Sequence, residues 1–126
     1  VQYAPVRTVF NKTLAEHEGI QWMLVDNEID LRTATMAVLH AADLADRGQP
    51  FRTETAIAKI LASEAAGRIV DRCIQIHGGY GVTKDLPLER WYRELRIRRI
   101  GEGTTETQRM VISRDVLAGR HRPMLR

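Results

Sequence analysis

Glu102 is the residue whose setting is best suited to chemistry, because its carboxylate stands between Gly101 and Gly103. Glycine on both sides permits unusual backbone angles and leaves room for another molecule to approach. A carboxylate held in this way can act as a general base, provided that a closed apolar pocket excludes water from it. It can equally be a solvated turn residue that complements the positive end of the next helix. The local sequence leaves both hypotheses open.

The residues after this turn, Thr104, Thr105 and Glu106, open the last predicted helix. Threonine is a good N-cap, so we expect Thr104 to cap this helix. The free backbone N–H groups of a helix start can also receive a polar or anionic ligand atom.

A second glycine-rich break, Gly78-Gly79-Tyr80-Gly81, follows Gln75 and His77. Such a break is explained by the end of a helix and a turn. It also allows a bulky ligand to approach the backbone closely. By itself this pattern is a weak signal for binding.

Arg7 and Phe10 form an RxxF pattern near the start of the chain. An arginine in this position is usually part of a surface ion pair. Its planar guanidinium is also well shaped to hold a phosphate.

The segment from Arg90 to Arg99 mixes cations with aromatic side chains. Nucleic-acid binding is one hypothesis, but Glu89 and Glu94 would repel phosphate and no recognition motif accompanies the segment. We therefore favour an exposed helix face with internal ion pairs, and we predict no nucleic-acid partner. The four histidines show no ligand spacing, and Cys73 is the single cysteine, so we predict no metal site.

Length and composition describe an ordinary globular domain. The chain has 126 residues, 44% hydrophobic and 28% charged, with a net charge of +3. No apolar run reaches the roughly 20 residues that a membrane helix needs. One domain over 1–126 is therefore predicted. Because the chain begins with Val1 rather than methionine, we expect it to be a piece of a longer protein.

Apolar residues recur at helical spacing through most of the chain, and no stretch alternates as a strand would. After an extended lead-in over residues 1–10, the predicted helices are Asn11–Asp46, Thr53–His77, Pro87–Arg98 and a last one from Thr104 that fades before Gly119. Short turns join them. The fold class is therefore all-α, an antiparallel four-helix bundle.

Three segments in register resemble the C-terminal helical domain of the acyl-CoA dehydrogenase family. They are RTVFNKTLAEHEGIQ, then QIHGGYG with the YRELR helix after it, and finally EGTTETQR. The resemblance covers almost the whole chain. It departs from the family at Asn11, where glycine is frequent, and at Glu18, where glutamine is frequent and could donate a hydrogen bond to the flavin.

The resemblance implies a flavoenzyme that oxidises an acyl-CoA thioester to the trans-2-enoyl-CoA, as in fatty acid β-oxidation. Glu102 would remove the α-proton while the β-hydrogen leaves as hydride to the FAD. An electron-transfer flavoprotein or a similar acceptor would reoxidise the cofactor. A homo-oligomer, dimer or tetramer, in the bacterial cytoplasm or the mitochondrial matrix is implied as well.

The resemblance also implies the contacts with FAD. Arg7 would meet the pyrophosphate with Phe10 packed nearby, and Glu18 occupies the position of a flavin hydrogen bond. Gln75, Gly78 and Gly79 would contact the adenosine-diphosphate part across a subunit interface. Thr104 and Glu106 would contact the FAD held chiefly by the same subunit.

A different class of function is a non-catalytic helical module whose role is oligomerisation, with Glu102 idle. The family also carries an N-terminal helical domain and a middle β-domain, and the first helix of its C-terminal bundle precedes the RxxF segment. We therefore expect the isolated 126-residue chain to bind FAD weakly or not at all and to have no turnover.

Overall fold

The computed structural model describes residues 1–120, and the part of the predicted domain beyond residue 120 lies outside the described residues. Four α-helices dominate it: α1 (Glu18–Asp46), α2 (Arg52–His77), α3 (Leu88–Arg98) and α4 (Thr105–Leu117). Two short 3-10 helices, η1 (Leu14–Glu16) and η2 (Gly78–Val82), and a two-stranded hairpin complete the fold. The predicted all-α class is confirmed.

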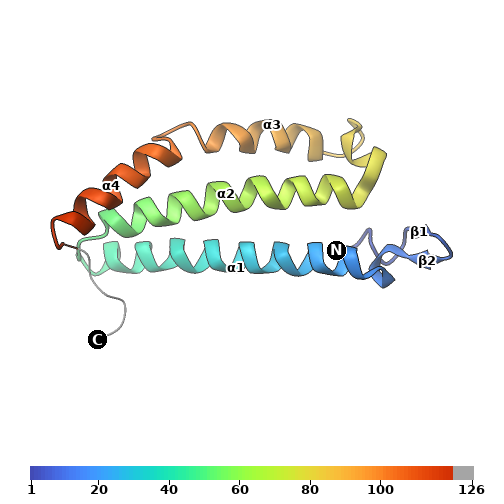
Figure 1. Ribbon diagram of the computed structural model, residues 1–126, viewed down its shortest axis with the longest axis horizontal. Coiled ribbons are helices and arrows are strands. Elements are labelled where there is room, and N and C mark those ends of the chain that lie inside the picture. The colour runs from blue at the N-terminus through green and yellow to red at the C-terminus, as the bar shows by residue number, and fades with distance from the viewer. Residues whose placement is uncertain (121–126) are drawn as a thin grey trace.

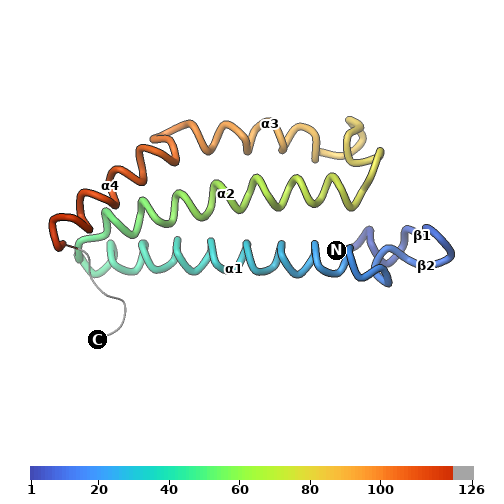
Figure 2. Tube along the Cα trace, viewed as in Figure 1, coloured from blue at the N-terminus to red at the C-terminus, as the bar shows by residue number. Residues whose placement is uncertain are grey.

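The long helices α1 and α2 run antiparallel, and α2 lies in the middle of the molecule (Figure 1). Helices α3 and α4 follow one another along the side of α2 that faces away from α1, as the Cα trace also shows (Figure 2). Small side chains at the contacts let these helices approach closely. The buried alanines are Ala34 and Ala41 on α1, and Ala56, Ala58 and Ala65 on α2.

Glycine residues follow the ends of α1 and α2, where the chain turns toward the next element. Gly48 has a φ of +63° after α1, and Gly78 has a φ of +60° after α2, which are left-handed conformations that glycine adopts without strain. The predicted ends of the first two helices are confirmed. Helices α3 and α4 also begin within a residue of their predicted starts.

The prediction that no strands form is wrong for the first part of the chain. Strand β1 (Thr8–Val9) pairs antiparallel with β2 (Lys12–Thr13), Thr8 opposite Thr13 and Val9 opposite Lys12. Strands of two residues are too short to show alternation. Phe10 and Asn11 form the two-residue turn with φ of +50° and +61°, the signs that a type I′ turn requires. Asn11 suits this turn because asparagine tolerates the left-handed region.

The first helix begins at Glu18, seven residues after the predicted start at Asn11. A capping box explains the difference. The backbone N–H and the hydroxyl of Thr13 each donate to Glu16 Oε2 at 2.7 Å, which opens a separate turn, η1. His17, with an extended backbone of φ −89° and ψ +120°, then separates η1 from α1. The pattern Thr-x-x-Glu in the sequence is the signal for the start of η1.

Candidate functional site

The sequence-predicted site residues lie in two groups at different places on α2. The first group surrounds a hollow of about 940 Å³ at the hairpin end of the molecule, which we call the hairpin hollow. The second lines a pocket of about 460 Å³ under the turn between α3 and α4, which we call the turn pocket. Helix α3, with 11 residues or roughly 16 Å of length, separates them.

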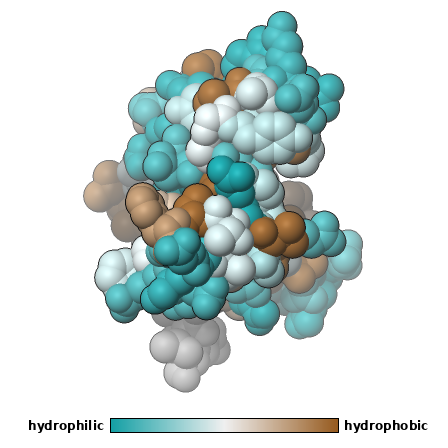
Figure 3. All heavy atoms as spheres, turned by 90° about the vertical axis from the view of Figure 1, so that its right-hand side faces the viewer, coloured by the Kyte–Doolittle hydropathy of each residue, from teal (hydrophilic) through white to brown (hydrophobic). Residues whose placement is uncertain are grey.

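The hairpin hollow brings together residues that are far apart in the chain. Arg7 lies beside Gln75, Gly78 and Gly79, although about 70 positions separate it from them. The remaining lining residues are Tyr3, Val6, Thr8, Val9, Leu14, Ile20, Ile76, His77 and Tyr80. Figure 3 looks at this end, where hydrophobic side chains lie among hydrophilic ones.

Two features leave this hollow open to a ligand. The Arg7 guanidinium is exposed and has no hydrogen-bond or ion-pair partner within residues 1–120. A Cβ built on Gly78 or Gly79 would meet no atom within 4 Å, so a ligand can reach both backbones. Gly81 is different, because its buried backbone packs directly on the last turns of α2.

His77 forms part of the wall of the hollow. Its ring stacks on Tyr3 with 4.2 Å between centroids and 22° between planes. Its Nδ1 lies 2.7 Å from the Cys73 carbonyl oxygen, which holds the ring against α2. Within residues 1–120 no group of three or more potential metal ligands is found. The structure therefore gives His77 a packing role.

Phe10 and Glu18 lie near the hollow but do not line it. Phe10 sits at the hairpin tip, 91% exposed and with a positive φ, which is costly for a bulky side chain. Such strain is typical of residues that contact ligands or partners. Glu18 is the first residue of α1 and its exposed carboxylate makes no hydrogen bond among the described residues.

The turn pocket contains Glu102 together with Lys59, Ile97 and Gly101. Its remaining lining residues are Ala62, Ser63, Ala66 and Arg98. Glu102 is exposed, and its φ of +54° is a strained conformation for a residue with a side chain. The following Gly103 has a φ of +90°, which glycine adopts without this cost.

The start of α4 fixes the residues after Glu102. Thr104 is the N-cap, and its hydroxyl oxygen accepts a hydrogen bond from the Thr107 N–H at 3.1 Å, which confirms the predicted cap. Hydrogen bonds from the backbone N–H of Glu106 and from the Thr104 hydroxyl lower the pKa of the Glu106 carboxyl. The carboxylate of Glu106 is therefore held at the positive end of the helix.

Ion pairs neutralise part of the arginine-rich helix α3. Arg93 pairs with the half-buried Glu89 at 3.0 Å, and Arg90 pairs with the exposed Glu94 at 3.6 Å, each one helical turn apart. These contacts fit the predicted solvent-facing helix. None of the described helices has the length and apolar character needed to cross a membrane.

A residue that the sequence reasoning missed is Glu64 on α2. Its carboxylate contacts both Arg99, just after α3, and Thr105, the first residue of α4. No local pattern identifies such a residue, because its two partners are 35 and 41 positions away.

Comparison with known proteins places this architecture in a family. The family described as "Acyl-CoA dehydrogenase, C-terminal domain" matches residues 1–117. The chain therefore belongs to the acyl-CoA dehydrogenase family, as its C-terminal domain.

Relatives of two kinds share similar identity with the chain. It is 44% identical to an acryloyl-CoA reductase (NADH) of Anaerotignum propionicum over 117 residues, 93% of this chain and 30% of that protein. It is also 44% identical to the mitochondrial short-chain specific acyl-CoA dehydrogenase of Mus musculus, over 93% of this chain and 28% of that protein.

Solved structures agree with the fold. The butyryl-CoA dehydrogenase of Megasphaera elsdenii matches with a TM-score of 0.90 and 36% identity, covering 92% of this chain and 30% of that one. The FAD complex of PigA matches with a TM-score of 0.89 and 27% identity, covering 94% of this chain and 30% of that one. The chain thus spans about 30% of the length of these relatives.

Proposed function

We propose that this chain is the base-bearing, flavin-contacting domain of an enzyme that oxidises an acyl-CoA thioester to the trans-2-enoyl-CoA. The observation that carries the proposal is Glu102. It stands in a strained turn beside a pocket, in a chain that belongs to the acyl-CoA dehydrogenase family. A positive φ on a residue with a side chain is costly, and such strain is frequent at functional sites.

The described residues fit a bound FAD. The free guanidinium of Arg7 can hold a phosphate in a bidentate manner, and Gly78 and Gly79 leave room for a ligand against their backbones. The capped start of α4 offers the Thr104 hydroxyl and free backbone N–H groups to a second FAD. When bound, FAD supplies the acceptor for the hydride that leaves the β-carbon.

Glu102 acts on the other hydrogen. Its carboxylate takes the α-proton of the thioester. Gly101 leaves space for the acyl chain on one side, because a Cβ there would meet only the Ile97 carbonyl oxygen, at 3.6 Å. Bound substrate and the rest of the full-length protein would exclude water from this carboxylate, as a glutamate base requires.

Because α3 separates the two groups of residues, we propose that they serve two cofactors in neighbouring subunits. Arg7, Phe10, Gln75, Gly78 and Gly79 would contact one FAD, and Thr104 and Glu106 the other. The outer face of α1 supports assembly, because it exposes a row of large apolar side chains. They are Trp22, Val25, Ile29, Met36 and Leu39.

The partners follow from the family. A Caffeyl-CoA reductase-Etf complex subunit of Acetobacterium woodii is 40% identical to this chain, which supports an electron-transfer flavoprotein as the redox partner. Relatives come from bacteria and from mitochondria, in line with the two predicted compartments. We expect the isolated chain to retain little FAD.

The reductases among the relatives favour a second candidate, the reverse reaction. In that direction Glu102 would return a proton to the α-carbon of an enoyl-CoA. The residues are the same, so the two candidates differ only in the redox partner that the full-length enzyme uses.

The experiment is a Glu102→Gln variant of the full-length protein. We expect FAD to remain bound and the bleaching of its absorbance by acyl-CoA to fall at least a thousandfold, because the amide cannot accept the proton. Glu94→Gln, which alters an exposed glutamate on α3, is the control and should bleach normally. Normal bleaching by Glu102→Gln would instead support a non-catalytic oligomerisation module.

A further inference from the structure

The turn that carries Glu102 continues directly from α3, and the N–H groups of Ile100 and Gly101 donate to the Ile97 carbonyl oxygen at 2.9 and 2.8 Å. This turn has weaker support beyond Gly101. It runs from Arg99 to Thr105, and the Thr105 N–H closes it by donating to the Arg99 carbonyl oxygen at 3.2 Å. Inside the turn, Gln108 Nε2 lies 3.5 Å from the carbonyl oxygens of Glu102 and Gly103, at the limit of a hydrogen bond. The position of Glu102 therefore depends on how the two ends of the turn are fixed.

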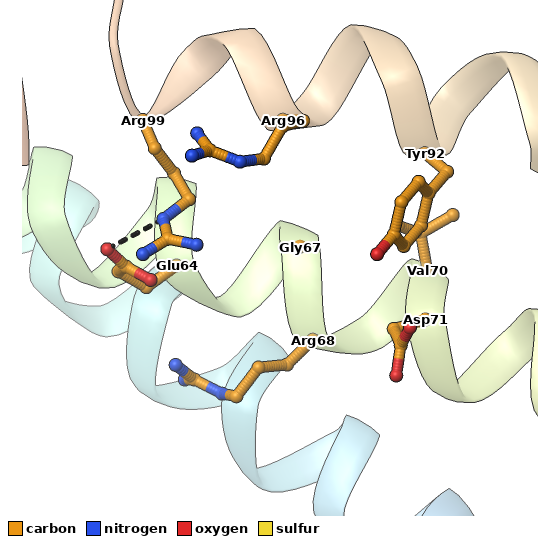
Figure 4. A pocket seen from close by; sticks show the side chains of 8 residues that line it. All are labelled: Glu64, Gly67, Arg68, Val70, Asp71, Tyr92, Arg96 and Arg99. Carbon is orange, nitrogen blue, oxygen red and sulfur yellow. Dashed lines mark ion pairs between the residues drawn. The ribbon is translucent and has the colours of Figure 1, made fainter.

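One carboxylate fixes both ends. Glu64 Oε1 accepts a hydrogen bond from the Thr105 hydroxyl at 3.1 Å. The same oxygen lies 2.9 Å from Nε of Arg99, and Figure 4 shows Arg99 reaching down from the end of α3 to Glu64 on α2. The Arg99 Nε–H does not point along a hydrogen bond, so this contact is an ion pair rather than a directional bond.

Burial makes these contacts effective. Thr105 is only 3% exposed, and the Glu64 side chain is 21% exposed, so water competes weakly for either. Arg99 is more open, with its side chain 41% exposed. Glu64 and Arg99 line a pocket of about 220 Å³ between α2 and α3. Arg96 lines this pocket too, and its guanidinium has no hydrogen-bond or ion-pair partner among residues 1–120. The hydrogen bond from Thr105 is thus the firmer of the two attachments.

We propose that Glu64 is a positioning residue for the base Glu102, holding both ends of its turn against α2. This inference rests on the proposed function of Glu102. Glu64 lies in a different pocket from the reacting carboxylate and does not reach the substrate. Its role is to keep Glu102 at one position over the turn pocket, where a displacement of about 1 Å can cost on the order of a hundredfold in rate.

The test uses the full-length holoenzyme and two variants of different severity. Glu64→Gln keeps an acceptor oxygen for Thr105 but loses the charge that attracts Arg99. Glu64→Ala loses both attachments. We expect the rate of flavin bleaching by saturating acyl-CoA to fall about tenfold for Glu64→Gln and about a hundredfold for Glu64→Ala, with KM and bound FAD unchanged.

A third variant links the effect to the turn. Thr105→Val removes the hydroxyl but keeps the shape of the side chain, so it should slow bleaching without loss of FAD. Combined with Glu64→Ala it should add little, because both changes break the same attachment. Glu94→Gln serves as the control for removal of an acidic charge.

The outcomes separate this proposal from the function of Glu102. If Glu64→Ala bleached at the normal rate while Glu102→Gln did not bleach, the positioning role of Glu64 would be overturned and the role of Glu102 as the base would stand. A parallel fall in bound FAD, thermal stability and rate would also overturn it, since Glu64 would then only support the fold. Should Glu64→Ala fail to fold, Glu64→Gln and Thr105→Val decide the question by the same rates.

Discussion

Replacing Gly81 with alanine should destabilise the protein, whereas the same change at Gly79 should not. A Cβ on Gly81 would lie 2.7 Å from the Ile74 carbonyl oxygen, 3.0 Å from Ile74 Cα and 3.1 Å from His77 Cβ. Two of these atoms belong to the backbone of α2, which cannot move aside as a flexible side chain can. A Cβ on Gly79 meets no atom within 4 Å, and its φ is not positive.

The expected sizes follow from two opposing terms. Overpacking typically costs about 1–3 kcal/mol. Loss of glycine's freedom in the unfolded chain returns about 0.4–1 kcal/mol. Gly81→Ala should therefore lose about 1–2 kcal/mol, or about 4–8 °C in melting temperature at about 4 °C per kcal/mol for a chain of this size. Gly79→Ala should be neutral or slightly stabilising.

Thermal unfolding followed by circular dichroism measures this difference, and bound flavin gives a second readout. In the full-length protein Gly79→Ala should bind FAD less tightly, because the added methyl occupies the space that the proposed cofactor approaches. For Gly81→Ala, by contrast, the main effect should be a lower melting temperature rather than weaker FAD binding. If Gly81→Ala had the same melting temperature as the wild type, the turn would have shifted away from Ile74 at little cost, and the expected clash would be refuted.

Three further perturbations test other contacts. Hydrogen bonds from Arg68 lower the pKa of Asp30 from 3.8 to about 2, so Asp30 stabilises the fold above about pH 4 and this contribution disappears as the pH falls toward 2. Asp30→Asn should thus lower the free energy of unfolding by about 1–2 kcal/mol at pH 7 and by progressively less below pH 4. Urea unfolding at several pH values measures this difference, and a difference between wild type and variant that grew in acid would contradict the expectation. Thr104→Ala removes the bond from the Thr107 N–H and should cost about 1 kcal/mol in the same assay, and no loss would show that water replaces the cap. Arg7→Ala should lower the FAD content of the full-length protein but leave the melting temperature of the isolated, flavin-free chain unchanged, because the Arg7 guanidinium has no partner within residues 1–120, and full retention of FAD would contradict its role at the phosphate.

Local sequence predicted the helices well because their causes are local. Gly48 and Gly78 end α1 and α2 in the left-handed conformation that glycine tolerates, and Thr104 caps α4 through its own hydroxyl. The start of α1 also has local causes. The capping box of Thr13 and Glu16 opens η1, and the extended backbone of His17 delays α1 until Glu18.

Local sequence could not predict how the residues of the candidate site are arranged in space. Arg7 meets Gly78 and Gly79 only because the hairpin folds against the end of α2. The turn of Glu102 is held by Glu64, whose hydrogen bond to Thr105 joins residues 41 positions apart. Backbone preferences act over a few residues, so they set where helices begin and end. Contacts across such separations depend on the register in which α3 and α4 pack on α2, and side-chain packing between helices sets that register.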